Sequence, residues 1–415
     1  MLRKDRLASS LLRNQAFRSL RGCVLAVGIT VMLAACENSQ RQYATAIAKG
    51  DSLRIAGELS RARETYERAV ALLPNRAQGW GRLGSALTAL AEDREAHRAL
   101  QKAHDLDPNV FEVQVALAIV LDRAGKFTSA QTHYQAAVDL RPRFAPTYYN
   151  FGYLYQQAGL YEAAAGQYRQ AVQLKPDFLE ALANLGYCYR RMLQPGLAVQ
   201  VYRRALQLAP RETPLLIGLG QSLMDIADFT AAAEIYQQAV DSGAEDAGLF
   251  YDLGKIAQQQ GREGPARSYF QRALQIDSDH AEAQHQLGMI MQAQHDLAAA
   301  EQLYRAAVQS DPDVPGPVYS LARLLMRGNR QGEGQKLMQV FRRLKEYDGR
   351  LQSQRRAVAR SRGEVQPLLE LGTLHREFGR HERARNAYER ALRLQPGSAL
   401  IRRALTALDS QAVTQ

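Results

Sequence analysis

The sequence is poor in cysteine and tryptophan, and its amino-terminal apolar run is too short to cross a membrane. Among 415 residues there are three cysteines and one tryptophan, and aromatic residues make up 7%. Three cysteines in so long a chain exclude a disulfide-stabilised scaffold. The apolar stretch 22–35 has 14 residues, whereas a transmembrane helix needs roughly 20. With 46% hydrophobic and 23% charged residues, the composition is that of a folded protein rather than a disordered one.

The first 35 residues have the pattern of an export signal. Residues 1–21 carry six basic residues and one acid, and the apolar stretch that follows ends in small residues. Its last residues, LAAC, resemble a bacterial lipobox ending at Cys36. That resemblance implies cleavage before Cys36, attachment of lipid to its thiol and further acylation, with palmitate among the expected chains. The alternative is a buried N-terminal helix with an incidental cysteine.

The expected location follows from this leader. Glu37 stands after the cysteine, where an aspartate would resemble an inner-membrane retention signal, so the resemblance implies a lipid anchor in the outer membrane facing the periplasm. Several acyl chains make a stable anchor, whereas a single chain is marginal. Removal of residues 1–35 lowers the net charge from +11 to +6. Cys188 is then the one free thiol, and a small buried side chain is the simplest interpretation of it.

Alanine recurs every 34 residues through most of the chain. The series is Ala62, Ala96, Ala130, Ala164, Ala198, Ala232, Ala266 and Ala300. Four residues later stand Tyr66, Leu100, Tyr134, Tyr168, Tyr202, Tyr236, Phe270 and Tyr304. Most units close with a proline, which cannot continue a helix. Apolar residues at helical spacing in each half of the period predict stacked pairs of antiparallel helices.

One unit carries a recognisable motif. Residues 77–110 contain Trp80, Leu83, Gly84, Ala96, Ala103 and Pro108. This resembles the tetratricopeptide repeat, which implies an all-α fold: a right-handed α-solenoid of about ten 34-residue helix-turn-helix repeats. A glycine recurs in the first half of most periods, for example Gly84 and Gly220. We expect it to lie opposite the alanine of the second helix, so that the two backbones approach closely.

The repeat pattern also predicts the domain organisation. We expect a lipoprotein signal peptide at 1–35, the lipidated cysteine with a short tether at 36–42, and nine repeats at 43–348. There follow an arginine-rich helical insert at 349–364, a tenth repeat at 365–398, and a capping helix with a tail at 399–415. The ninth repeat departs from the pattern, with glycine and phenylalanine where alanine is expected. Seven-residue spacing of apolar residues there predicts a lengthened helix over about 333–361.

A first candidate site lies on the inner wall of the solenoid. In the family that the repeats resemble, this wall binds extended peptides or partner helices. The inward-facing residues here include Tyr149, Tyr153, Gln156, Gln157, Tyr187, Arg190 and Arg191. Tyrosine and arginine are enriched at interface hot spots, so this cluster is a candidate protein-binding surface. The alternative is that the tyrosines simply fill the core.

A second candidate site lies near the carboxyl end. Residues 350–403 hold thirteen arginines, no lysine and five glutamates. The residues chosen as an anionic-partner patch are Arg355, Arg356, Arg360 and Arg362. Such a charge favours an acidic protein, an anionic polysaccharide or membrane head groups, although a solvated helix surface explains it equally well. Export from the cytoplasm argues against nucleic acid.

No catalytic motif is present, so we expect neither an enzyme nor a cofactor. The segment HQLGMIMQAQH, 285–295, offers soft ligands for a metal ion, with His285 and Met289 four residues apart on the inner wall. Met291, however, falls at a core position and His295 in the turn between helices, and we expect no metal site. The favoured function is a scaffold for protein–protein interactions in assembly of a secretion, pilus or polysaccharide-export machine. The alternatives are a glycan-binding or export module that uses the basic end, and an adaptor for peptidoglycan hydrolases.

Overall fold

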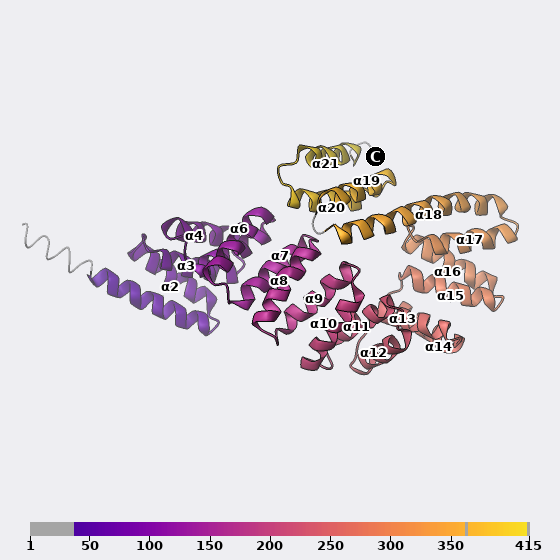
Figure 1. Cartoon of the computed structure of the whole chain (residues 1–415), viewed down its shortest axis with the longest axis horizontal. Coiled ribbons are helices and arrows are strands. Elements are labelled where there is room, and N and C mark those ends of the chain that lie inside the picture. The colour runs from indigo at the N-terminus through magenta and orange to yellow at the C-terminus, as the bar shows by residue number, and fades with distance from the viewer. Residues whose placement is uncertain (1–36, 362–363, 413–415) are drawn as a thin grey trace, which may run out of the picture. The chain divides into compact units, whose positions relative to one another are not determined.

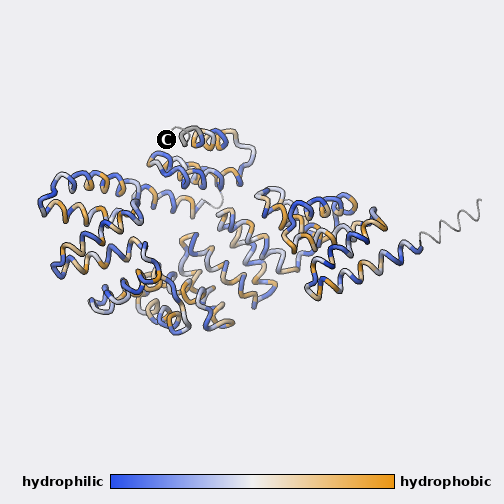
Figure 2. Tube along the Cα trace, turned by 180° about the vertical axis from the view of Figure 1, so that it is seen from behind, coloured by the Kyte–Doolittle hydropathy of each residue, from blue (hydrophilic) through white to orange (hydrophobic). Residues whose placement is uncertain are grey.

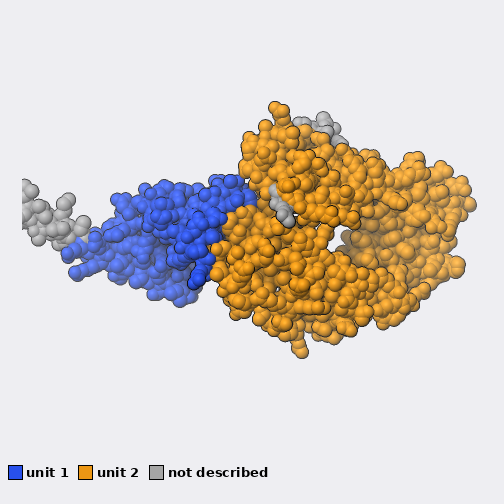
Figure 3. All heavy atoms as spheres, in the orientation of Figure 1, with its two compact units in different colours: residues 1–143 blue, residues 144–415 orange. Residues whose placement is uncertain are grey.

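The computed structural model describes residues 37–361 and 364–412, and within them every regular element is an α-helix (Figure 1). The chain forms two compact units, residues 1–143 and 144–415 (Figure 3). The predicted all-α fold of stacked helix pairs is confirmed. The expected leader 1–35, Cys36 and Arg362 lie outside the described residues. None of the described helices combines the length and the apolar character that a membrane span requires.

In the first unit, residues 37–55 are helical, and five further helices follow. These are α2 (Leu59–Leu72), α3 (Ala77–Ala89), α4 (Asp93–Leu106), α5 (Phe111–Arg123) and α6 (Phe127–Leu140).

The second unit begins with ten helices of nearly equal length. These are α7 (Ala145–Gln157), α8 (Tyr161–Leu174), α9 (Leu179–Arg191), α10 (Pro195–Leu208), α11 (Thr213–Asp225), α12 (Phe229–Asp241), α13 (Ala247–Gln259), α14 (Glu263–Ile276), α15 (Ala281–Ala293) and α16 (Leu297–Ser310). The helices after them are less regular. They are α17 (Pro315–Arg327), α18 (Gln331–Arg360), α19 (Gln366–Glu377), α20 (His381–Leu394) and α21 (Ala399–Ala412).

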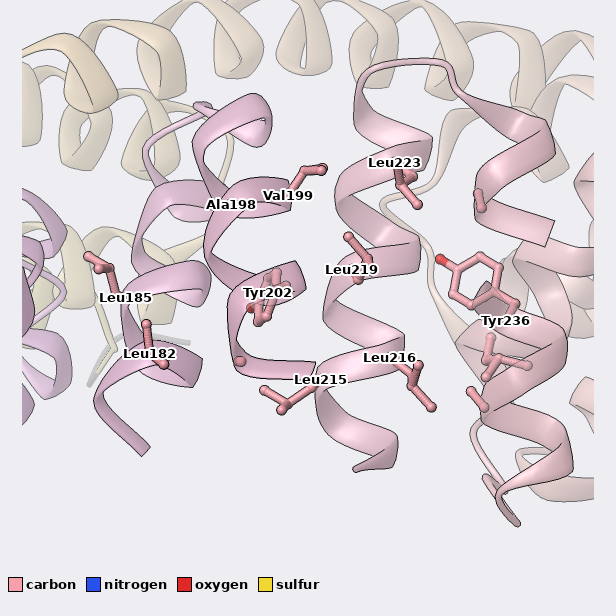
Figure 4. Packing of buried hydrophobic residues seen from close by; sticks show 14 of the residues in the cluster. Leu182, Leu185, Ala198, Val199, Tyr202, Leu215, Leu216, Leu219, Leu223 and Tyr236 are labelled. Carbon is pink, nitrogen blue, oxygen red and sulfur yellow. The ribbon is translucent and has the colours of Figure 1, made fainter. Parts of the chain in front are cut away.

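Each helix carries its apolar residues on one face, as the tube in Figure 2 shows by its alternation of orange and blue. In α8 the residues that the period singles out, Ala164, Tyr168 and Ala171, are all fully buried. Their spacing of three and four places them on one side of the helix. Within the second unit one cluster of buried residues extends from Ala164 on α8 to Ala283 on α15, because each helix pair buries this face against the next pair. Figure 4 shows this packing, with Leu182, Tyr202 and Leu219 between successive helices.

The recurring glycines accommodate the aromatic ring of the second helix, which corrects the expectation that they face the alanine. A Cβ atom on Gly220 would lie 2.4 Å from Cε1 of Tyr236, and one on Gly372 would lie 2.4 Å from the same atom of Tyr388. Other members of this set are Gly152 with Tyr168, Gly186 with Tyr202, Gly254 with Phe270 and Gly288 with Tyr304. The ring thus fills the space that the missing side chain leaves, which explains why glycine and an aromatic residue recur together.

Helix α18 is where the regular series ends. Its first part packs on α17, where a Cβ on Gly334 would lie 2.8 Å from the carbonyl oxygen of Ala322. Its second part continues without a turn and packs on α19 and α20 through Tyr347 and Leu351. The helix therefore joins the ninth helix pair to the last one as a single rod of 30 residues.

Candidate functional site

A cavity of about 960 Å³ in the second unit brings together residues that are far apart in the sequence. It is lined by the turn before α8 and the start of that helix, by the ends of α9, α11 and α18, and by α19 and α20. Its arginines are Arg190, Arg191, Arg355, Arg383 and Arg390, and its carboxylates are Glu162, Asp225 and Glu382. We call it the arginine cavity. Leucine, valine and methionine side chains also line it, including Leu193 and Leu371, beside the polar Ser361, His375 and Asn386.

A second cavity of about 550 Å³ adjoins the first. The two share Glu162, Met192, Leu193 and Ala359, and the second adds Arg356 and Arg360. Seven arginines and three carboxylates therefore line this joined region. A concave surface with an excess of positive charge favours ligands of negative charge.

Arg390 connects the two ends of the second unit. Its Nη2 donates a hydrogen bond of 2.8 Å to the carbonyl oxygen of Gly159, and its guanidinium lies 5.9 Å from the ring centroid of Tyr161. Gly159 has φ +72°, and a Cβ there would lie 2.5 Å from Nε of Arg390. Only glycine permits both that backbone conformation and that approach without strain. The contact therefore depends on one glycine and one arginine that are 231 residues apart.

The charge of Arg390 is poorly compensated. Its Nε is buried and has no hydrogen-bond partner among the described residues. Burial, followed by the nearby charges of Arg191 and Arg393, lowers the pKa of its guanidinium, although Tyr161 acts in the opposite direction. A buried guanidinium is favourable only when it is paired. The site therefore contains a cation that an anionic group would stabilise.

The other arginines of the cavity differ in their pairing. Arg190 lies 3.5 Å from Asp225, and Arg383 lies 2.9 Å from Asp313. Arg191 instead donates to the hydroxyl of Tyr187 at 2.9 Å and stacks 4.7 Å from the ring centroid of Tyr161.

Three arginines of the cavity remain without an acidic partner. In the part of the chain that the structure describes, no carboxylate lies within 4.0 Å of Arg191, Arg355 or Arg390. Among the cavity's arginines, these three are therefore the ones whose charge is available to a ligand.

His375 is a buried histidine that lines the arginine cavity. It is 7% exposed, and its Nδ1 lies 2.8 Å from the hydroxyl of Tyr347. Burial, together with the nearby charges of Arg383, Arg355 and Arg380, lowers the pKa of His375 to about 4, although Asp313 acts in the opposite direction. The imidazole is therefore neutral at physiological pH.

In the first predicted site, some residues contribute to the packing between helices and others are exposed to solvent. Tyr149 is partly buried, with its ring 5.1 Å from that of Phe178, and Gln156 accepts a hydrogen bond from Tyr168. Tyr153 is 42% exposed, and Gln157 is exposed as well. None of these four predicted residues lines the arginine cavity.

The arginine cavity is lined by residues from both of the predicted sites. Arg190 and Arg191, from the inner-wall set, line it together with Arg355 from the anionic-partner patch. Sequence reasoning assigned these residues to separate sites, and it did not single out Arg383, Arg390 or Tyr161. The excess of arginine over residues 350–403 was the one available signal for the first two. The contact to Gly159 depends on the curvature of the whole unit, which no local pattern encodes.

Two family models described as tetratricopeptide repeat match the sequence. One matches residues 149–213 and 217–281, and the other matches residues 365–408. The chain contains tetratricopeptide repeats. The matched repeats include Arg190, Arg191, Arg383 and Arg390, whereas α17 and α18 lie between the matched segments.

Solved structures of other repeat proteins are similar to parts of the chain. One is pilF of Pseudomonas aeruginosa, with 21% identity, a TM-score of 0.43, and coverage of 50% of this chain and 95% of that one. Another is YrrB, a tetratricopeptide protein with an unusual peptide-binding site, with 22% identity, a TM-score of 0.42, and coverage of 46% and 97%.

A third is the carboxyl-terminal part of a repeat protein from Cytophaga hutchinsonii, with 15% identity, a TM-score of 0.49, and coverage of 58% and 99%. No curated protein sequence matches the chain. Similarity at this level does not specify a function.

Tetratricopeptide proteins generally mediate protein–protein interactions, and no enzymatic domain is indicated. Among residues 37–361 and 364–412, no group of three His, Cys, Asp or Glu side chains is arranged to hold a metal ion. In the segment 285–295, Nε2 of His285 lies 2.9 Å from the hydroxyl of Ser320, while Met289 is 41% exposed.

Proposed function

We propose that the protein is a lipid-anchored scaffold of a bacterial outer membrane that binds protein partners in the periplasm through the arginine cavity. The proposal depends on one observation: seven arginines from α9, α18 and α20 line two adjoining cavities. Arginine is favoured where a charged side chain must be both partly buried and specific in its hydrogen bonding. A surface of this kind is suited to recognition rather than to catalysis.

The leader pattern supports the proposed location. Residues 1–35 combine a basic segment, a short apolar segment and the LAAC motif that ends at Cys36. The six residues 37–42 between Cys36 and the predicted start of the first repeat are helical, and at 1.5 Å per residue they rise about 9 Å. An anchored chain would therefore hold its first repeat beside the lipid surface. This geometry suits assembly of a secretion, pilus or polysaccharide-export machine, or recruitment of peptidoglycan hydrolases.

Affinity capture from solubilised membranes tests the scaffold function. The wild type is compared with Arg191→Gln/Arg355→Gln, which alters the arginine cavity, and with Tyr153→Ala/Gln157→Ala, which alters the open inner wall. Arg342→Gln is the matched control, because Arg342 is exposed on α18 and lines neither cavity. We expect the cavity variant alone to lose partners. Retention of every partner by that variant would contradict the proposed surface.

The anchor is tested separately by metabolic labelling with an alkynyl fatty acid. The wild type should incorporate the label and fractionate with the outer membrane, whereas Cys36→Ser should remain unlabelled. Label that persists in Cys36→Ser would exclude lipidation at this residue.

An anionic glycan is the second candidate ligand. Arg356 and Arg360 favour it, because they are exposed on α18 and no carboxylate of the described residues lies within 4.0 Å of them. Such binding would be electrostatic and should weaken as salt is added. Binding that is insensitive to salt would exclude this candidate.

A further inference from the structure

The arginine cavity contains a specific arrangement of charge that indicates what it binds. Two of its five arginines already have carboxylate partners, since Arg190 pairs with Asp225 and Arg383 pairs with Asp313. Arg191, Arg355 and Arg390 have none among the described residues. Because these three come from α9, α18 and α20, the fold presents to one cavity three cations that have no carboxylate partner among the described residues. A ligand with more than one negative charge would match this arrangement.

Besides its charged residues and the polar Ser361, His375 and Asn386, the cavity is lined mainly by aliphatic side chains. Met192, Leu193, Leu368, Leu371 and Leu394 line it beside the arginines. Its volume of about 960 Å³ lies at the upper end of the range of roughly 300–1,000 Å³ that ligand pockets occupy. A peptide offers carboxylates together with methylene and methyl groups, whereas a uronic-acid polysaccharide offers carboxylates on a hydroxylated backbone. The mixture of cations and aliphatic side chains therefore favours a peptide.

The site differs from the inner wall of the repeats. The lining residues of α8, α9 and α11 stand at the ends of helices and in the adjoining turns, at Gly159–Glu162, Arg190–Leu193 and Asp225. The opposite lining comes from α18, α19 and α20, which the contact between Arg390 and Gly159 holds against the α7–α8 turn. The cavity therefore exists only when the last repeat reaches back to the first helices of the second unit.

We propose that the arginine cavity binds a short acidic peptide segment, whose carboxylates pair with Arg191, Arg355 and Arg390. This inference rests on the proposed function and specifies the chemistry of the partner. Guanidinium groups bind carboxylates through paired hydrogen bonds that an ammonium group does not reproduce. The ligand also supplies the negative charge that Arg390 lacks, so binding stabilises the contact between the two ends of the second unit.

Fluorescence anisotropy tests this inference with the full chain in detergent. The probe is a fluorescein-labelled peptide, Gly-(Glu-Asp)₃-Gly, and its control is the isosteric amide Gly-(Gln-Asn)₃-Gly. We expect the acidic peptide to bind and the amide peptide to bind at least about tenfold more weakly. Equal binding of the two peptides would overturn the inference.

Three single variants localise the binding. Arg355→Gln and Arg191→Gln should each weaken the acidic peptide roughly three- to tenfold, and Arg342→Gln should leave it unchanged. Arg355→Gln is the cleanest test, because Arg355 is exposed and forms no ion pair with the described residues whose loss would perturb the fold. Helical content by circular dichroism checks each variant. If both cavity variants bind as the wild type does, the peptide occupies another surface and the inference fails.

The outcomes also separate this inference from the proposed function. Absence of acidic-peptide binding, with partner capture intact, would overturn the inference and leave the scaffold proposal standing. Loss of both would overturn both. Competition with polygalacturonate tests the other class of ligand: if this polymer binds more tightly than the peptide, and Arg355→Gln abolishes its binding, the cavity is a glycan site and the peptide inference is wrong.

Discussion

The second unit contains two regions that are built differently. From α7 to α16 the helices have 13 or 14 residues each, and each pair repeats the same close approach of a glycine to an aromatic ring. From α17 onward the pattern changes: α18 has 30 residues, Gly334 replaces an alanine, and arginine becomes the dominant charged residue. The regular region repeats one packing solution, whereas the last region uses several.

The candidate site depends on this difference. The regular helices contribute Arg190, Arg191 and the turn at Gly159, but they form only one side of the arginine cavity. The other side comes from the region in which the period is broken. A uniform solenoid would continue in the direction of its curvature, and it is the long α18 that positions α19 and α20 for contact with Gly159. The departure from the repeat therefore creates the site.

The largest expected effect on stability comes from removing a buried aromatic ring in the regular region, α7 to α16. Tyr236 is fully buried, and its hydroxyl donates to Asp252 at 2.8 Å. Tyr236→Ala should lower the free energy of unfolding by about 3–5 kcal/mol, because it leaves a cavity against Gly220. Urea titration followed by circular dichroism measures the change. Tyr153→Ala, at a residue that is 42% exposed, is the control and should cost less than about 1 kcal/mol.

The second prediction concerns the last region, α17 to α21, and the dependence of its stability on pH. The pKa of His375 is about 4 in the folded chain and roughly 6.5 in the unfolded chain. Between these values the unfolded chain binds the proton and the folded chain does not, so stability is complete above about 6.5 and falls toward pH 4. The loss attributable to His375 reaches about 3 kcal/mol.

Urea midpoints at pH 7.0, 5.5 and 4.5 measure this dependence. His375→Asn should show a shallower loss of stability with acid than the wild type. His295→Asn is the control, because His295 is exposed and its φ of +63° suits asparagine. Identical slopes for the wild type and His375→Asn would contradict the assignment.

A third comparison uses two glycines within regular helices. Gly220→Ala would place a Cβ atom 2.4 Å from the ring of Tyr236, whereas nothing lies within 4 Å of a Cβ on Gly166. We expect Gly220→Ala to destabilise the fold by about 1–3 kcal/mol. Gly166→Ala should instead stabilise it by up to about 1 kcal/mol, since alanine is the better helix former. Thermal unfolding of the pair decides the point, and equal midpoints would be inconsistent with the close contact.

The smallest effect concerns α18. A Cβ on Gly349 would meet nothing within 4 Å, so Gly349→Ala should stabilise this helix by about 0.5–1 kcal/mol. Slower amide hydrogen exchange over residues 340–355 would show the gain locally. Unchanged exchange there would mean that α18 is held entirely by its packing on the neighbouring helices.

The fold could be predicted from the sequence because the residues of each repeat specify their own pair of helices. A 34-residue period in Ala164, Tyr168 and their equivalents determines where each helix lies and which face it buries. The pairing of Gly220 with Tyr236 was missed, because the period shows that both recur but not which side chains touch. The arginine cavity was missed as a single site for a related reason. Arg191 and Arg355 line one cavity only after the small rotations between many successive helices have accumulated.

The unbroken length of α18 has a mechanical consequence. At 1.5 Å per residue its 30 residues form a strut of about 45 Å, with neither proline nor a turn at which it could hinge. A displacement of α17 at one end is therefore transmitted to α19 at the other, and the mouth of the cavity would widen or narrow in step with bending of the helices that precede it.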